Sequence, residues 1–375
     1  MAIHLNMKKM KICLVSLTVS PDSADGEAKV VRSHFDYLRK RGYDVKLISG
    51  KWSTDLKHPD IIQFDLLRKR FLWVFHFNYQ VIKFLRGQNF DIVHANSAKA
   101  AIPVLFSNRK KLITTIHDFT PFETQLTRFP FEKYLIKFIA YKSAIITTVS
   151  NTIRNKFKKF LPGIDLNKVL TIYNGIEERF KPYPRKSAEL KRKLGLEGPI
   201  ILYIGRITAY KGVDYIISAY HIVKKTNPKV NLVIGGTPDF LMEKQYQKWI
   251  KQHQDISFVG YISEEELPYY YSMADMFINY SFSSEGFGLT PLEALACGTP
   301  IICSSIKVYK EIFEDSALFI PPKNSKKLAD SIIQLLSDKN LRDELIQNAQ
   351  KVLSKYSWDA VINRLEKIYT LFNPN

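Results

Sequence analysis

Hydrophobic residues in the first half of the chain fall into two alternating patterns. Short aliphatic and β-branched runs predict strands, and longer segments with apolar residues at helical spacing predict helices between them. One helix is predicted over residues 28–42, with Val30 and Phe35 on its apolar face. Gly42 follows a basic last turn and is the expected C-cap of this helix. Strands are predicted at residues 11–17, 44–49, 91–95, 111–116, 144–149 and 169–173.

The same pattern restarts after a polar, proline-containing stretch at residues 174–198, which we interpret as a linker. A helix is predicted over residues 211–225, and strands are predicted at residues 199–205, 230–236, 256–260, 276–280 and 299–305. Two successive runs of alternating strands and helices predict an α/β protein with two Rossmann-like, doubly wound domains facing each other across a cleft. Ligands of such sheets bind at the carboxyl ends of the strands.

Composition and length agree with two domains that each have a core. The chain has 375 residues, of which 46% are hydrophobic. Its three cysteines, Cys13, Cys297 and Cys303, lie in apolar segments, which argues against a disulfide framework and predicts a reducing, cytoplasmic environment. Residues 7–21 imitate a signal peptide but lack a clean cleavage site, so a buried first strand is favoured. The apolar run at 71–82 is shorter than the about 20 residues that span a bilayer.

Positive charge is concentrated in the first half of the chain. Residues 1–175 carry 29 Lys and Arg against 13 Asp and Glu, and so hold +16 of the formal net charge of +19. This asymmetry suggests that the first half meets an anionic membrane surface or a nucleic acid. Three segments mix cations with bulky aromatic residues: 67–86, 131–142 and 153–161. Each alone fits a packed helix with a basic outer face equally well, but together they favour peripheral membrane association and a lipid-linked or anionic acceptor.

Residues 283–305 place carboxylates in a stretch that is otherwise apolar or small. Thr290, Pro291 and Glu293 are expected to form the N-cap, first residue and third residue of a helix, as in a capping box. Glu285 has no such structural explanation, because it lies in a loop whose glycines let a ligand approach the backbone. Since helix N-termini attract phosphate, a nucleotide-sugar site is one interpretation of the spacing, and a purely structural role of Glu293 is the other.

Residues 285–302 resemble the Glu-x7-Glu signature of the retaining glycosyltransferases of family 4, which have the two-domain GT-B fold. Further segments resemble the family in the same order along essentially the whole chain: 91–97, 114–119, 149–157, 171–176, 202–220 and 356–369. The resemblance implies an N-terminal acceptor-binding domain over residues 1–175, completed by a C-terminal helix within 357–375. Residues 176–356 would form the nucleotide-sugar-binding domain.

The resemblance also implies roles for individual residues. Arg206 and Lys211 match the Gly-Arg-x4-Lys-Gly element whose cations grip the donor diphosphate, where they would stabilise the charge of the leaving group. Glu293 would hold the ribose and Glu285 the donor sugar, while His117 matches a histidine that contacts the sugar from the first domain. Further donor-binding positions are Gly26, Gly260, Tyr261, Gly286, Phe287, Gly288 and Leu289.

Two positions in the first domain depart from the family pattern or match it loosely. The family usually has two adjacent glycines in its first loop, whereas here Gly26 follows Asp25, a carboxylate that could instead meet the acceptor hydroxyl. His94 stands where the family often has a second histidine, and we expect it to line the site.

The reaction that the resemblance implies is transfer of a hexose-type sugar from a nucleotide-diphosphate sugar to an acceptor hydroxyl, on a lipid-linked or cell-surface glycan precursor. Retention could use a carboxylate nucleophile in principle. The family implies instead a front-face attack, in which the leaving phosphate accepts the acceptor's proton. There is no convincing Asp-x-Asp motif, so Arg206 and Lys211 are expected to replace a metal ion, and no cofactor is expected.

The sequence also allows other classes of protein. A sugar-nucleotide epimerase or a glycan phosphorylase could use the same fold, although we find no pyridoxal-lysine motif. A basic RNA-binding protein would leave Glu285 and Glu293 unexplained and would lack a recognisable module, so no nucleic-acid partner is expected. His117 and Asp118 lack the companions of a metal phosphohydrolase site. The expected location is the cytoplasm, with peripheral association at the inner face of the cell membrane.

Overall fold

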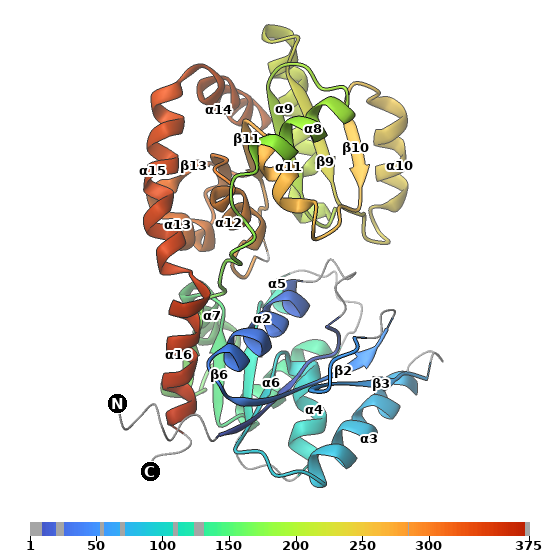
Figure 1. Cartoon of the computed structure of the whole chain (residues 1–375). Coiled ribbons are helices and arrows are strands. Elements are labelled where there is room, and N and C mark those ends of the chain that lie inside the picture. Colours follow the sequence, from blue (N-terminus) through green and yellow to red (C-terminus); the bar gives the residue numbers. More distant parts are fainter. Residues whose placement is uncertain are drawn as a thin grey trace. The chain divides into compact units, whose positions relative to one another are not determined.

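The computed structural model describes residues 10–19, 26–52, 56–67, 72–107, 112–123, 131–283 and 285–371. The chain divides into two compact units, the first made of Met1–Gly175 with Trp358–Asn375 and the second of Ile176–Ser357. Each unit has its own parallel sheet with helices packed against it (Figure 1). The doubly wound α/β architecture predicted from the alternating pattern is therefore confirmed.

The sheet of the first unit has the strand order β3-β2-β1-β4-β5-β6-β7, and every described pair is parallel. Its strands are β1 (Lys11–Val15), β2 (Asp44–Lys51), β3 (Ile61–Asp65), β4 (Ile92–Ala95), β5 (Leu112–Ile116), β6 (Ile145–Thr148) and β7 (Val169–Thr171). Central strands β4, β5 and β6 are buried along their whole length, as parallel strands covered on both faces must be. The order reverses between β1 and β4, which is the usual ligand-binding point of such sheets.

The helices of the first unit are α2 (Gly26–Lys40), α3 (Leu72–Arg86), α4 (Ala98–Phe106), α5 (Thr120–Glu123), α6 (Glu132–Lys142), α7 (Asn151–Phe160) and α16 (Trp358–Thr370), with a short 3₁₀ turn at Leu166–Lys168. Helix α2 packs against α16, whereas α4 packs against both α3 and α6 (Figure 1). Gly42 has a φ of 86° just after α2, as expected for the predicted C-cap.

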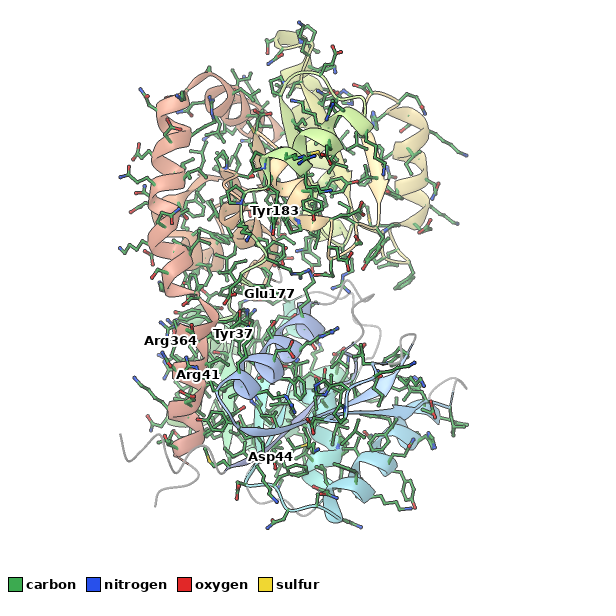
Figure 2. All side chains as sticks on the ribbon, in the orientation of Figure 1. Tyr37, Arg41, Asp44, Glu177, Tyr183 and Arg364 are labelled. Carbon is green, nitrogen blue, oxygen red and sulfur yellow. The ribbon has the colours of Figure 1, made fainter. Side chains whose placement is uncertain are left out.

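The last helix returns to the first unit through a close contact with a glycine. A Cβ atom at Gly175 would lie 2.5 Å from the ring of Trp358, so only glycine fits beside this indole. Trp358 also stacks on Tyr37 at 5.5 Å between ring centroids. Arg41, which follows α2 and is labelled in Figure 2, forms an ion pair with Asp359 of α16 at 2.8 Å. Helix α16 thus belongs to the first unit.

The sheet of the second unit has the order β10-β9-β8-β11-β12-β13 and is also parallel. Its strands are β8 (Ile200–Ile204), β9 (Asn231–Gly235), β10 (Ser257–Gly260), β11 (Met276–Asn279), β12 (Ile301–Ser304) and β13 (Ala317–Ile320). Its helices are α8 (Pro184–Lys193), α9 (Val213–Thr226), α10 (Glu243–Gln252), α11 (Leu267–Met273), α12 (Leu289–Ala296), α13 (Lys307–Phe313), α14 (Ser325–Ser337) and α15 (Lys339–Lys355), with 3₁₀ turns η2 (Ala209–Lys211) and η3 (Glu314–Ser316). The core forms where α9, α10 and α14 bury apolar residues against the sheet.

Two expectations about boundaries are wrong. The stretch at 174–198 is no simple linker, because it contains α8, which packs against α11. Ser357 was expected in the first domain, but it pairs with Ile176 by a β-bridge and belongs to the second unit. Both features depend on contacts between residues far apart in the chain, which composition does not show. Among the described residues, no helix is long and apolar enough to cross a bilayer.

Candidate functional site

Loops at the carboxyl edge of the second sheet bring together residues that lie about 80 positions apart. Arg206 follows β8 and its side chain is exposed, while Lys211 ends the turn η2 after the same strand. Glu285 lies between β11 and α12, and β11 pairs directly with β8. Adjacent parallel strands therefore place the two predicted cations and the loop carboxylate at one edge.

Lys211 and Glu285 form a partly buried ion pair between Nζ and Oε1. Their side chains are 17% and 10% exposed, and the Ser281 hydroxyl donates a second hydrogen bond to Oε1 at 2.8 Å. Burial alone would lower the pKa of Lys211, but the negative charge of Glu285 outweighs it and raises that pKa. Lys211 is thus held in its charged form, as a preformed cation.

Buried phenols surround this ion pair. Burial and the charge of Glu285 raise the pKa of both Tyr203 and Tyr309 well above its ordinary value, so both phenols stay protonated. The Tyr203 hydroxyl donates to the carbonyl of Arg206 at 3.2 Å and so fixes the backbone of the loop after β8. Because these buried rings keep water away, electrostatic interactions with Lys211 are stronger there than in bulk water.

Helix α12 begins at Leu289, two residues earlier than predicted, and the capping box is wrong. Its N-cap is Gly288 with a φ of 102°, and no side chain caps the first turn. A Cβ at this glycine would lie 3.0 Å from the ring of Tyr309, so both conformation and space favour glycine. Thr290 and Glu293 are therefore the second and fifth helical residues. The amides of this helix start remain available to an anion.

Glu293 is buried in α12, with 3% exposure, and accepts a hydrogen bond from the Tyr271 hydroxyl at 2.7 Å. Burial and the charge of Glu293 raise the pKa of Tyr271 well above its usual value. The charge of Glu293 also acts on Arg179, which lies in the stretch interpreted as a linker. Sequence reasoning missed both Arg179 and Tyr271, and no spacing or motif in a single sequence singles out either of them.

The remaining predicted donor-binding positions of the second unit differ in accessibility. Gly260 ends β10 with a φ of 67° and open space around its Cα, and the next residue, Tyr261, is exposed. Gly286 is half-buried. Phe287 is buried and packs edge-on against Tyr356 at 5.3 Å, so its side chain belongs to the core. Only backbone atoms of Phe287 remain for a ligand.

His117 and Gly26 lie in the first unit, at the carboxyl edge of its sheet. His117 follows β5, and its Nε2 contacts the carbonyl of Asn96 at 2.8 Å. Gly26 is the first residue of α2, whereas Asp25 lies outside the described residues. The structure thus gathers ten of the twelve predicted residues into the second unit and leaves these two in the first.

His94 is not the lining residue that we expected. It is buried in β4, where Nδ1 contacts the Tyr369 hydroxyl at 2.9 Å and Nε2 contacts the Thr115 hydroxyl at 2.8 Å. Burial lowers the pKa of His94 to about 3, with smaller contributions from His34 and His117. A neutral histidine with both ring nitrogens occupied holds α16 to the sheet.

Comparisons with known proteins cover both units. The family model "Glycosyl transferases group 1" matches residues 186–352, and the model "Glycosyltransferase Family 4" matches residues 24–180. An uncharacterized glycosyltransferase of Methanocaldococcus jannaschii is 31% identical over 243 residues, which are 62% of this chain and 61% of that protein. N-acetyl-alpha-D-glucosaminyl L-malate synthase of Bacillus anthracis is 27% identical over 298 residues, which are 75% of each chain.

Two solved structures share the architecture over almost the whole chain. HepE of Anabaena, in complex with UDP and glucose, has a TM-score of 0.82 at 18% identity and covers 96% of this chain and 99% of its own. Sucrose-phosphate synthase of Thermosynechococcus elongatus has a TM-score of 0.81 at 22% identity and covers 98% of this chain and 100% of its own. The fold is therefore that of the GT-B glycosyltransferases. The chain belongs to glycosyltransferase family 4, as its two matching models show.

Proposed function

We propose that this protein transfers a hexose-type sugar from a nucleotide-diphosphate sugar to an acceptor hydroxyl with retention of anomeric configuration. The observation that carries the proposal is the partly buried Lys211–Glu285 ion pair beside Arg206, at the carboxyl edge of the second sheet. Family membership and the UDP bound by HepE support a nucleotide-sugar donor. A sugar-nucleotide epimerase on the same fold remains the alternative outcome.

In this proposal the two cations hold the diphosphate. Arg206 is exposed and free to swing onto a ligand, whereas Lys211 is already oriented by Glu285. The start of α12 at Gly288 adds backbone amides and the positive end of a helix dipole. Charge that develops on the leaving phosphate would therefore be stabilised by groups that need no further reorganisation.

Glu285 binds and orients the donor sugar, and the leaving phosphate accepts the proton of the attacking hydroxyl. A carboxylate paired with Lys211 and hydrogen-bonded to Ser281 is a weaker nucleophile than a free one, which favours this front-face reaction over a covalent intermediate. Glu293 would hold the ribose, and Gly260 with Tyr261 would lie beside the base. The donor contact of His117 stays a prediction from the family resemblance.

Nucleoside diphosphate release tests the proposal. The protein is incubated with a panel of sugar nucleotides and a lipid extract as the source of acceptors, and product configuration is read by NMR. We expect release with one donor or a small group of donors, and a product with the anomeric configuration of the donor. Inversion would contradict retention, and an epimerised sugar nucleotide without release would favour the epimerase.

Transfer is expected to be independent of metal ions, because Arg206 and Lys211 supply the positive charge that a divalent cation supplies elsewhere. The measurement is the rate of nucleoside diphosphate release before and after treatment with EDTA. We expect the two rates to agree. Loss of activity in EDTA that magnesium or manganese restores would contradict this prediction.

We further propose that the acceptor is lipid-linked and that the first unit reaches it from the surface of an anionic bilayer at the inner face of the cell membrane. Helices α3 and α6 each expose one mixed row of side chains, here called the aromatic-basic face: Leu72, Phe75, Tyr79, Lys83, Arg86, Lys133, Tyr134, Lys137, Phe138, Tyr141 and Lys142. Phe75 is 70% exposed and Tyr134 is 69% exposed. Rings beside cations on surface helices suit the boundary between headgroups and acyl chains.

The third aromatic and basic segment, at 153–161, does not contribute to this face. In α7, Phe157 is fully buried, and the ring of Phe160 packs against those of Phe119 and Phe122. The rings of α7 therefore belong to the core of the first unit, as expected for a packed helix with a basic outer face. The aromatic-basic face is confined to α3 and α6, with α4 packed between them.

Removing two charges of the aromatic-basic face is expected to weaken vesicle binding. Lys133→Gln with Lys137→Gln should lower partitioning onto phosphatidylglycerol vesicles by about 10- to 30-fold, since each surface cation contributes about 1 kcal/mol. Flotation measures the effect, and Lys244→Gln with Lys248→Gln, equally spaced on α10, is the matched control. Binding that is insensitive to salt, or equal loss in the control, would contradict a role of this face.

A further inference from the structure

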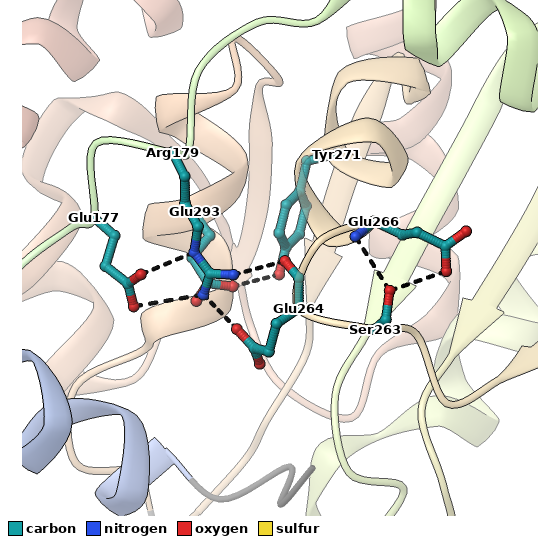
Figure 3. Close-up of polar contacts among 7 residues, drawn as sticks. All are labelled: Glu177, Arg179, Ser263, Glu264, Glu266, Tyr271 and Glu293. Carbon is teal, nitrogen blue, oxygen red and sulfur yellow. Dashed lines mark hydrogen bonds and ion pairs between the residues drawn. The ribbon is translucent and has the colours of Figure 1, made fainter. Parts of the chain in front are cut away.

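We infer that Arg179 is a positioning residue for the nucleoside part of the donor, and that it aligns Glu293 with the loop after β10. The inference rests on the proposed function, in which Glu293 holds the ribose and the loop after β10 lies beside the base. It adds a residue from the stretch that connects the two units, well outside the motifs that indicate the family. Figure 3 shows the polar contacts of Arg179 with Glu177 and Glu264, and that of Tyr271 with Glu293.

The first set of contacts fixes the loop after β10. Arg179 Nη1 donates to the main-chain carbonyl of Glu264 at 2.7 Å, and Nη2 donates to the carboxylate of the same residue. Glu264 lies four positions after Gly260, which ends β10. The guanidinium therefore holds both backbone and side chain of this loop, and Nε pairs with Glu177 at 2.8 Å. A fork of several donors constrains geometry more strongly than a single charge does.

The second set of contacts leads from Arg179 to Glu293. The guanidinium lies over the ring of Phe180 at 4.8 Å, and that ring packs edge-on against Tyr271 at 6.1 Å between centroids. The Tyr271 hydroxyl donates to Glu293 Oε2 at 2.7 Å. Arg179, Phe180 and Tyr271 thus form a continuous path of packed side chains. The path ends on the carboxylate proposed for the ribose.

The positive charge of Arg179 also acts on the carboxylate of Glu293. A buried carboxylate is costly unless a hydrogen bond and an opposite charge compensate it. Tyr271 supplies a hydrogen bond, and Arg179 supplies a permanent positive charge. Burial alone would lower the pKa of Arg179, but three carboxylates that face it raise the pKa instead. These belong to Glu177, Glu264 and Glu293.

The balance of charge around Arg179 indicates which part of a nucleotide this cluster of side chains would bind. One guanidinium among three carboxylates leaves an excess of negative charge, and Arg179 is already engaged by Glu177 and Glu264. Such a cluster attracts hydroxyl donors and repels a further anion. Ribose hydroxyls therefore belong on this side of the site, and the diphosphate belongs with Arg206 and Lys211. The expected signature of Arg179 is an effect on the nucleoside alone.

Calorimetric titration tests the inference. UDP, GDP, ADP and CDP are titrated into the wild type, and the tightest of them is compared with its 2′-deoxy form and with inorganic pyrophosphate. Arg179→Met is expected to raise the Kd of the ribonucleotide by about 10- to 100-fold, as the loss of a charged hydrogen-bonding partner does. The preference for ribose over 2′-deoxyribose should shrink, while the Kd of pyrophosphate should stay unchanged. Donor KM should rise with little change in kcat.

Three further variants separate positioning from general structural damage. Arg179→Lys should recover only part of the affinity, because lysine lacks the planar fork. Tyr271→Phe, which keeps the ring and removes the hydroxyl, should show the same loss of ribose preference and serves if Arg179→Met fails to fold. Combining Arg179→Met with Glu293→Gln should cost no more than either change alone. Arg185→Met is the control, since Arg185 is 93% exposed and pairs with Glu189 of its own helix.

Each outcome has one meaning. An unchanged ribonucleotide Kd in Arg179→Met, an equal loss for pyrophosphate, or additive effects of the Arg179 and Glu293 variants would overturn the inference. If the wild type binds none of the four nucleotides, the proposed function itself fails, and the inference fails with it. A selective loss of ribose binding that is shared by the Arg179, Tyr271 and Glu293 variants supports the positioning role.

Discussion

Replacement of Lys211 by Met is expected to lower the free energy of unfolding of the second unit by about 3 kcal/mol, because it leaves the carboxylate of Glu285, whose side chain is 10% exposed, without its cation. The hydroxyl of Ser281 alone cannot replace a charge in a site walled by Tyr203 and Tyr309. The measurement is denaturant unfolding followed by signals from the second unit. Activity should be lost as well, because the diphosphate would lose one of its two cations.

The double variant Lys211→Met with Glu285→Gln separates these two effects. Removing both charges should restore most of the lost stability but none of the activity. The matched control is Lys186→Met, since Lys186 pairs with Glu189 on the exposed face of α8. A surface pair of this kind contributes about 1 kcal/mol or less. If the Lys211 variant is as stable as the control, the Lys211–Glu285 pair contributes no more to stability than a surface ion pair, which would contradict the prediction.

Replacement of Arg206 by Met is expected to lower kcat by about 10²- to 10³-fold, the usual cost of removing one group that stabilises a developing negative charge. Stability should stay close to that of the wild type, because the side chain is exposed and the hydrogen bond from Tyr203 goes to the main-chain carbonyl of Arg206, which the substitution keeps. Steady-state kinetics and a thermal melt measure the two quantities on the same preparation.

Arg185→Met, at a fully exposed arginine of α8, is the control for Arg206 as well. It should change neither kcat nor the melting temperature. If Arg206→Met lowers the melting temperature as much as the activity, its role is structural. If it leaves kcat unchanged, the diphosphate lies elsewhere.

The buried strands could be predicted from sequence because both of their faces are covered. Strands β4, β5 and β8 are buried along their whole length and rich in aliphatic or β-branched residues, so they stand out between polar turns. Two strands were missed, β3 and β13, and both lie at an edge of their sheet with partly exposed residues. The polar Gln63 interrupts the apolar run of β3, whereas β13 is apolar but only four residues long.

The candidate site could be predicted only where its residues lie in a motif. Arg206, Lys211 and Glu285 were recognised from local segments, and the sheet then brought them to one edge. Arg179 could not be found in this way, because its partner Glu264 lies 85 positions further along the chain. The capping box failed for a local reason: Gly288 takes a left-handed conformation and starts the helix before Thr290. No composition signal distinguishes a glycine that caps from one that merely turns.

The central claim is that the carboxyl edge of the second sheet binds a nucleotide-diphosphate sugar through Arg206 and Lys211. Calorimetric titration of the full chain with a panel of sugar nucleotides, repeated on Arg206→Met, tests it most directly. The account predicts that at least one sugar nucleotide binds the wild type and that Arg206→Met weakens this binding by about 10-fold or more. Binding of equal strength in both proteins, or no binding by the wild type, would contradict it.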